Sequence, residues 1–258
     1  MQLGLKGKKA LVTASGRGIG QAIALSLAQE GCRVAVVSRT RSDVEGVVRR
    51  MGGASKGHRG SVMDLTKEGA PKKLAARLKT SFGYPDIVVH NLGGALDIRD
   101  PFCSIKDWRR IYRLNFEVAV ELNLQLLPPM VKQRWGRVIH ISSISGMENQ
   151  GPVTYCAMKA ALTAYTRSLG GVVAPDGVVV SAVLPGAVFT RQGYWDETLK
   201  KRPEHVKKFL SERQRIGRFG KPEEIADLVT FLASELASFN TGSIIPIDGG
   251  QGRGYFGQ

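Results

Sequence analysis

Cysteine is scarce in this sequence of 258 residues. Only Cys32, Cys103 and Cys156 are present, and they form no CxxC pair. Three widely spaced cysteines predict neither a disulfide framework nor a zinc site, so we expect reduced thiols and no bound metal. This cysteine usage is typical of a cytoplasmic protein.

Long hydrophobic runs are also missing. No stretch approaches ~18 uninterrupted apolar residues, which excludes a transmembrane helix. The N-terminus does not resemble a signal peptide, because Lys6, Lys8 and Lys9 are followed by only a short apolar run. We therefore expect no membrane partner.

Acidic residues are few: the chain has 22 Asp and Glu and 37 Lys and Arg, which gives a net charge of +15. Such a charge attracts nucleic acid, acidic surfaces or anionic substrates. The sequence has no basic run interleaved with aromatic residues and no zinc-finger spacing, so we expect no nucleic-acid partner. Between Arg191 and Arg218 alone, nine basic residues stand against four acidic ones.

Short β-branched runs alternate with longer segments whose apolar residues recur every three or four positions. Several runs are continuously apolar, as expected of strands buried on both faces. Strands that alternate with helices predict parallel neighbours joined by right-handed crossovers, and no linker divides the chain. We predict one α/β domain over residues 1–258, with a doubly wound, seven-stranded parallel sheet and helices on both faces. The expected strands are 9–13, 33–38, 57–62, 86–91, 137–142, 178–184 and 243–247.

A glycine-rich turn joins the first expected strand to the first helix. Residues 13–20 read Thr-Ala-Ser-Gly-Arg-Gly-Ile-Gly. Glycines let the backbone approach a pyrophosphate, which then lies on the N–H groups of the helix N-terminus. Ordinary turns also use glycine, but the position after a strand and before a helix favours a dinucleotide.

The second expected strand ends in Ser38 and Arg39, with no acidic residue before Asp43. An acidic residue there would bind the ribose 2′-hydroxyl of NAD, whereas an arginine accommodates the 2′-phosphate of NADP. Arg17 adds a second guanidinium from the glycine turn. We therefore expect NADP(H) to be preferred, with NAD(H) possible; in the alternative interpretation, Arg39 and Arg41 are solvated loop charges.

Tyr155 and Lys159 begin a predicted helix at a spacing that places both on one face. A cation beside a phenol favours its ionised form and suits it to proton transfer. Ser142 and Ser143 end the fifth expected strand, at the carboxyl edge where ligands bind in such sheets. Alone, the Tyr–Lys pair would indicate only packing, but the serines favour a catalytic site.

These features together resemble the short-chain dehydrogenase/reductase family, of the Rossmann type, along essentially the whole chain. Ala14 replaces one motif glycine, and we expect slight backbone strain there with binding retained. His90 replaces a motif asparagine, and we expect it to be a satisfied strand-end residue. The family motifs are matched in order by residues 13–20, by 90–93, by Asn115, by 141–146, by Tyr155 and Lys159, by 185–190, by 215–226 and by 247–250.

The resemblance implies a role for each matched residue. Tyr155 would be the general acid in reduction, and Lys159 would lower its pKa and bind the nicotinamide ribose. Asn115 would hold a water in a proton relay, and a serine would bind the substrate oxygen. The implied cofactor contacts are Ser15, Arg17, Gly18, Ile19, Gly20, Ser38, Arg39, Asp64, Leu65, Asn91, Gly93, Tyr155, Lys159, Pro185, Gly186, Val188 and Thr190.

Two serines compete for the catalytic position. Counting thirteen residues back from Tyr155 gives Ser142, whereas aligning the Ser-Ser-x-x-Gly motif gives Ser143. A loop can vary in length, but a strand end cannot slip without turning its side chains over. We therefore favour Ser143, with Ser142 as the alternative.

The family places its substrate lid after the Pro-Gly motif, here at about 189–214. The basic residues of this segment would attract an anionic or carrier-bound substrate, or they would form a solvated helix face. The chain is most similar to 3-oxoacyl-acyl-carrier-protein reductases, which implies an NADP(H)-dependent oxidoreductase acting on a ketone or secondary alcohol. A sugar or polyol dehydrogenase, or a non-catalytic cofactor-binding protein, is the alternative. Family members usually assemble as homotetramers or dimers.

Overall fold

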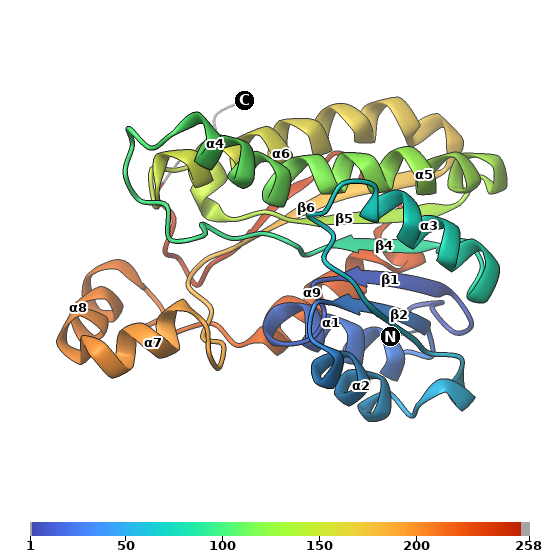
Figure 1. Cartoon of the computed structure of the whole chain (residues 1–258), viewed down its shortest axis with the longest axis horizontal. Coiled ribbons are helices and arrows are strands. Elements are labelled where there is room, and N and C mark those ends of the chain that lie inside the picture. Colours follow the sequence, from blue (N-terminus) through green and yellow to red (C-terminus); the bar gives the residue numbers. More distant parts are fainter. Residues whose placement is uncertain (1, 254–258) are drawn as a thin grey trace.

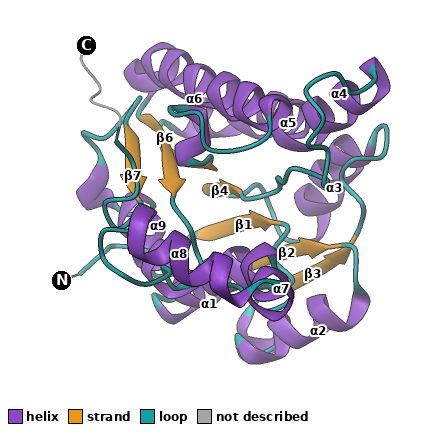
Figure 2. Cartoon of the chain, turned by 90° about the vertical axis from the view of Figure 1, so that its left-hand side faces the viewer, coloured by secondary structure: helices purple, strands orange, loops and turns teal. Residues whose placement is uncertain are grey.

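The computed structural model describes residues 2–253. Its centre is a sheet in the order β3-β2-β1-β4-β5-β6-β7, in which each neighbouring pair of strands is parallel. Figure 2 shows this sheet between two layers of helices. The predicted seven-stranded, doubly wound sheet is confirmed. The strands are β1 (Lys9–Thr13), β2 (Arg33–Ser38), β3 (Arg59–Val62), β4 (Ile87–His90), β5 (Gly136–Ile141), β6 (Val178–Pro185) and β7 (Ile244–Ile247).

Helices cover both faces of the sheet (Figure 1). One layer contains α1, α2 and α9, the other contains α3 to α6, and α7 and α8 lie apart from both, beyond the carboxyl ends of the strands. No helix within residues 2–253 is long and apolar enough to cross a membrane. The helices are α1 (Gly18–Gln29), α2 (Arg41–Arg50), α3 (Ala70–Ser81), α4 (Ile105–Tyr112), α5 (Val118–Gln133), α6 (Val153–Val173), α7 (Tyr194–Lys201), α8 (Pro203–Arg213) and α9 (Pro222–Leu232).

The strands bury apolar side chains on both sides. On β1, Ala10 and Val12 belong to the core that includes α1 and α9, whereas Leu11 belongs to the core that includes α3 and α5. Successive residues of a strand point to opposite faces, so a strand between two helix layers is apolar at every position. This explains why several strand segments, such as β2 and β4, are continuous apolar runs and do not alternate.

The observed strand ends differ from the predicted ones by at most two residues. The largest difference is at β3, which begins at Arg59 and not at residue 57. Gly57 has a φ of 84°, in the left-handed region, where it ends a short 3-10 turn over Ala54–Lys56. That turn delays the strand, because glycine readily adopts a backbone conformation incompatible with extended structure.

The direction of strand order reverses between β1 and β4, so the loops that follow these two strands part and leave a crevice. Asn91 connects the loops. Its backbone N–H donates to Thr13 Oγ1 (2.9 Å), and its side-chain amide donates to the backbone oxygen of Ala14 (3.1 Å). These bonds fix the floor of the crevice where the functional residues gather.

Two adjacent glycines of α6 allow a matched test of how this helix packs against the segment before β7. A Cβ on Gly170 would lie 2.6 Å from the backbone nitrogen of Gly242, whereas a Cβ on Gly171 would meet nothing within 4 Å. We expect Gly170→Ala to lower the free energy of unfolding by about 1–3 kcal/mol through overpacking. Gly171→Ala should raise it by about 0.5–1 kcal/mol, because alanine loses less entropy in a helix. Urea unfolding of both variants checks this, and a shift in the same direction for both would contradict the described packing.

Candidate active site

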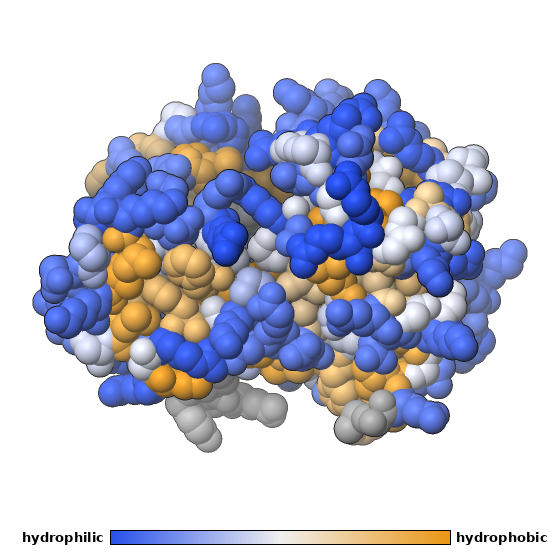
Figure 3. Space-filling view, turned by 90° about the horizontal axis from the view of Figure 1, so that it is seen from below, coloured by the Kyte–Doolittle hydropathy of each residue, from blue (hydrophilic) through white to orange (hydrophobic). Residues whose placement is uncertain are grey.

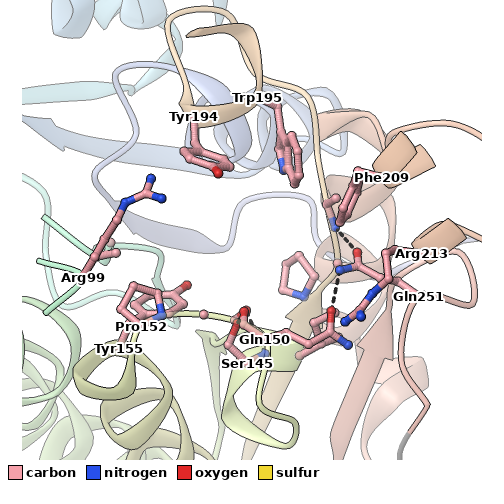
Figure 4. A pocket seen from close by; sticks show the side chains of 18 of the residues that line it. Arg99, Ser145, Gln150, Pro152, Tyr155, Tyr194, Trp195, Phe209, Arg213 and Gln251 are labelled. Carbon is pink, nitrogen blue, oxygen red and sulfur yellow. Dashed lines mark hydrogen bonds between the residues drawn. The ribbon is translucent and has the colours of Figure 1, made fainter. Parts of the chain in front are cut away.

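Two cavities open at the carboxyl edge of the sheet. The first, called the long cavity, has a volume of about 630 Å³ and extends from Arg39 after β2 to Lys159 of α6. The second, called the open cavity, has a volume of about 1060 Å³ and lies between the loop after β4, the start of α6, and α7 and α8 (Figure 4). Ser143 and Tyr155 line both, so the cavities meet at these two side chains.

Most of the predicted cofactor contacts line the long cavity, but Ser15 and Gly20 do not. The Ser15 hydroxyl lies inside the turn, where it donates to the backbone oxygen of Val12 (2.8 Å) and accepts from the backbone N–H of Val37 (3.0 Å). Both residues therefore shape the turn without facing the cavity. The predicted residues that do line it are Arg17, Gly18, Ile19, Ser38, Arg39, Asp64, Leu65, Asn91, Gly93, Tyr155, Lys159, Pro185, Gly186, Val188 and Thr190.

The turn between β1 and α1 needs small residues. A Cβ on Gly16 would lie 2.7 Å from Ser38 Oγ, and one on Gly20 would lie 2.6 Å from the backbone oxygen of Ala14. Ala14 itself has a φ of 49°, in the left-handed region where residues with a Cβ are strained. The expected strain at this alanine is therefore present.

The first turn of α1 faces the long cavity. Arg17 precedes the helix and makes no side-chain cap, and Gly18 and Ile19 line the cavity. First-turn N–H groups without a cap carry partial positive charge and bind phosphate. This end of the cavity therefore fits a pyrophosphate. The Arg17 guanidinium donates to Gln192 Oε1 (3.1 Å), which links the turn to the segment before α7.

The far end of the long cavity combines a cation with two carboxylates. Arg39 lines it together with Asp43, which lies in the first turn of α2. The Asp64 carboxylate accepts hydrogen bonds from the backbone N–H (3.0 Å) and hydroxyl (2.7 Å) of Thr66. Burial raises the pKa of Asp64, but these hydrogen bonds and the charge of Arg39 outweigh it and hold the pKa below its usual range.

The two candidate serines point in different directions. The Ser142 hydroxyl is buried and donates to the backbone oxygen of Lys159 (3.1 Å), so it ties β5 to α6. Ser143 lines both cavities together with Tyr155, whereas Ser142 lines only the long one. The geometry therefore supports the choice of Ser143.

Tyr155 and Lys159 occupy the junction of the two cavities, one helical turn apart. Burial raises the pKa of Tyr155 to about 12, although the nearby Ser143 hydroxyl opposes this. Burial also lowers the pKa of Lys159 to about 8. The Lys159 Nζ donates to the backbone oxygen of Ile141 (2.9 Å) and lies 5.6 Å from the centroid of the Tyr155 ring. In this structure, burial therefore outweighs the expected lowering of the phenol pKa.

Asn115 lies outside both cavities, in a π-helical turn over Arg113–Glu117. Its amide donates to the backbone oxygens of Gly94 (2.9 Å) and Ile111 (3.0 Å), and its Oδ1 accepts from the N–H of Gly94 (2.9 Å). Single π-turns recur at functional sites. A Cβ on Gly93 would lie 2.9 Å from both Asn115 Oδ1 and Lys159 Nζ, so these two groups enclose the glycine.

His90 forms part of a buried polar network. Its Nε2 is hydrogen-bonded to Asn123 Oδ1 (2.8 Å), and its ring stacks on His140 with centroids 4.9 Å apart. Burial lowers the pKa of His90 to about 4, which keeps the ring neutral. The expectation of a satisfied strand-end residue is confirmed.

Two glutamines in the wall of the open cavity were not predicted from the sequence. Gln251 Oε1 accepts from the backbone N–H of Ala187 (2.7 Å), and Gln251 Nε2 donates to Gln150 Oε1 (2.8 Å). Gln150 Nε2 in turn donates to the Glu148 carboxylate. This chain joins the loops after β5 and β6 to the segment after β7. The two glutamines are 101 residues apart, and only the matched motif at 247–250, just before Gln251, marked this region.

An aromatic cluster holds α7 and α8 over the open cavity. Trp195 lies between Phe209 (centroids 4.3 Å apart) and Phe219 (4.9 Å apart), with Tyr194 edge-on to it at 5.0 Å. Figure 3 shows apolar surface at the end of the molecule that carries these helices. The cluster gives this segment an apolar inner side, to which Lys208 and Arg213 of the same segment add basic groups that line the cavity.

Comparison with known proteins gives the family. A family model described as enoyl-(acyl carrier protein) reductase matches residues 13–251. The 3-oxoacyl-[acyl-carrier-protein] reductase of Aquifex aeolicus is 37% identical over 255 residues, covering 97% of this chain and 99% of the relative.

Solved structures agree with this result. L-sorbose reductase from Gluconobacter frateurii, complexed with NADPH and L-sorbose, superposes with a TM-score of 0.90 at 29% identity, covering 97% of this chain and 98% of that chain. A 3-oxoacyl (acyl-carrier-protein) reductase from Agrobacterium tumefaciens C58 with NADP bound superposes with a TM-score of 0.88 at 32% identity, covering 96% of each. The chain therefore belongs to the short-chain dehydrogenase/reductase family and is an NAD(P)-dependent oxidoreductase.

Proposed function

We propose that this protein is an NADP(H)-dependent carbonyl reductase, with 3-oxoacyl thioesters of the acyl-carrier-protein type as its first candidate substrates. The observation that carries the proposal is that Tyr155 and Ser143 both line the two cavities where these meet. A cofactor in the long cavity and a ketone in the open cavity would meet there. The substrate class rests on the similarity to the relative from Aquifex aeolicus.

The chain's own residues supply the proton and the orientation. Bound nicotinamide supplies the hydride for the carbonyl carbon. Tyr155 donates its hydroxyl proton to the carbonyl oxygen, and Ser143 holds that oxygen by a hydrogen bond. A cation beside the phenol stabilises the phenolate that remains, and Lys159 is one helical turn away. Asn115 fixes the loop at Gly94 and so positions the wall of the long cavity beside Lys159.

Residues 189–214 form the proposed substrate lid. The segment contains α7 and α8 and supplies Tyr194, Trp195 and Phe209 to the open cavity. Its contact with the glycine turn, through Arg17 and Gln192, supports a position beside both the cofactor and the substrate. Closure over bound substrate would exclude water from the junction.

Reduction of a keto-sugar is the second candidate function. The wall of the open cavity contains the paired amides of Gln150 and Gln251, and hydroxylated substrates need such polar partners. The fold similarity to L-sorbose reductase supports this candidate. A panel of 3-oxoacyl thioesters beside keto-sugars, followed by NADPH absorbance, separates the two.

Removing the Tyr155 hydroxyl tests the mechanism. We expect Tyr155→Phe to lower kcat by about 10²–10⁴-fold, because the proton donor is lost, while the Kd for NADPH changes little. Tyr165→Phe on the same helix is the matched control, since the Tyr165 hydroxyl accepts from Asn123 away from both cavities. The rate of NADPH oxidation gives kcat, and fluorescence titration gives the Kd for NADPH. A fully active Tyr155→Phe enzyme would refute the role.

Cofactor preference depends on the cation after β2. Arg39 lines the long cavity where an adenosine 2′-phosphate would lie, but so does Asp43. We expect Arg39→Ala to raise the Kd for NADPH by about 10- to 100-fold through loss of charged hydrogen bonds, and to leave the Kd for NADH nearly unchanged. Arg49→Ala, at the exposed end of α2, controls for net charge. Equal weakening of both cofactors by Arg39→Ala would show that Arg39 does not select the phosphate.

Burial of Lys159 makes stability depend on pH. Its folded pKa of about 8 lies below the ordinary value of 10.5, so between these values the unfolded chain binds a proton that the folded protein does not. Unfolding free energy therefore rises with pH across this window. Relative to Lys159→Met, the cofactor-free wild type should gain roughly 3 kcal/mol between pH 7.5 and 10.5. Urea unfolding at several pH values measures this difference, and a flat difference would mean that the amine is solvated.

A further inference from the structure

The charged groups that line the open cavity are not all paired. Lys208 and Glu212 form an ion pair with atoms 3.9 Å apart. Within residues 2–253, the side chains of Arg99 and Arg213 make no hydrogen bond or ion pair, although both line the cavity. Figure 4 shows them on opposite sides of it, Arg99 on the loop after β4 and Arg213 at the end of α8. Each offers a set of N–H donors to whatever occupies the space between them.

Arg99 is oriented by a contact that uses none of its donors. Its guanidinium lies over the ring of Tyr194, 5.5 Å from the centroid. Stacking on an aromatic face fixes the plane of a guanidinium and leaves its edge N–H groups free for a bidentate contact with a carboxylate or phosphate. The same contact joins the loop after β4 to α7 across the mouth of the cavity.

Arg213 belongs to a wall that is rich in donors. On this wall, the amide oxygens of both Gln150 and Gln251 already accept a hydrogen bond. The Glu148 carboxylate accepts from Gln150 Nε2 and from the backbone N–H of Arg253. The acceptors of this wall are thus engaged by the protein, while the Arg213 guanidinium is free. Oxygen atoms that carry negative charge suit such a surface best.

Two carboxylates line the open cavity, and of these Glu212 is paired with Lys208 while Asp97 opposes an anionic ligand. Asp97 lines the open cavity on the same loop as Arg99, and it has a left-handed backbone φ of 56°. No basic nitrogen within residues 2–253 lies within 4.0 Å of its carboxylate. Asp97 therefore does not neutralise either arginine by direct pairing, but its charge weakens the attraction of the cavity for anions.

We propose that the open cavity selects ketones that carry a carboxylate or a phosphate, with Arg99 and Arg213 binding the anionic group while Tyr155 and Ser143 hold the carbonyl. The inference rests on the proposed reductase function and names its substrate class. Arg99 and Arg213 are exposed at the cavity wall, and hydrogen bonds from a charged guanidinium still favour an anion over its neutral isostere by about tenfold. Neutral substrates of the same skeleton should therefore be reduced with a higher KM.

Matched substrate pairs test the proposal. The pairs are 3-oxobutanoate with its methyl ester, and fructose 6-phosphate with fructose. The first pair tests recognition of a carboxylate, and the second tests recognition of a phosphate. We expect Arg99→Gln and Arg213→Gln to raise KM for the preferred anion at least tenfold and to leave the neutral partner nearly unchanged. Asp97→Asn should lower KM for the anion. Lys207→Gln, an exposed change of equal charge on α8 outside the cavity, should leave both constants unchanged.

Three outcomes overturn the proposal. A methyl ester or free ketose reduced as efficiently as its anion contradicts the substrate class. Equal effects of Arg213→Gln and Lys207→Gln on KM for the anion show that only the net charge of the protein matters, and not a contact from Arg213. The absence of any NADPH oxidation refutes the reductase function. In that case, the binding of the anions alone tests whether the cavity recognises them. Calorimetric titration of 3-oxobutanoate and fructose 6-phosphate into the enzyme–NADP⁺ complex, where reduction cannot occur, must still show tighter binding to wild type than to Arg213→Gln.

Discussion

The hydrogen bond from Lys159 Nζ to the backbone oxygen of Ile141 determines the arrangement of the site. It joins the first turns of α6 to the carboxyl end of β5. The bond from the Ser142 hydroxyl to the backbone oxygen of Lys159 makes a second connection, one residue beyond the strand end. With helix and strand held in this way, Tyr155 and Ser143 face each other across the same junction. Ser142 has a structural role here and Ser143 faces the ligand side, although the two are adjacent in sequence.

The same burial that positions these groups also opposes their charges. A phenol with a pKa of about 12 is neutral at pH 7, whereas an amine with a pKa of about 8 is still mostly protonated there. Lys159 therefore keeps most of its positive charge at neutral pH and would stabilise the phenolate that forms when Tyr155 gives up its proton. Gly93 leaves room for this amine, because a Cβ there would lie 2.9 Å from both Asn115 Oδ1 and Lys159 Nζ.

Local patterns in the sequence were sufficient for the sheet and for the Tyr–Lys pair. Continuous apolar runs identified the central strands β2 and β4, because burial on both faces leaves almost no polar position there. The start of β3 was misplaced by two residues because the left-handed Gly57 depends on a turn that hydrophobic pattern does not reveal. Arg99, Gln150 and Gln251 were missed for a different reason. Each comes to the open cavity from a separate loop, so only the folded chain shows that they line the same cavity.

Charge density was a poor guide to where an anion would bind. In the basic segment that includes α7 and α8, Lys200 lies 3.1 Å from Asp196 and 3.2 Å from Glu197, while Arg218 is paired with Glu224. Such exposed pairs are screened by solvent and leave little directed attraction. Arg213 belongs to the same segment and Arg99 lies outside it, yet both face the cavity without a partner among residues 2–253. Specific recognition depends on unpaired donors held at a cavity wall, so two arginines among 37 basic residues carry the inference and the net charge does not.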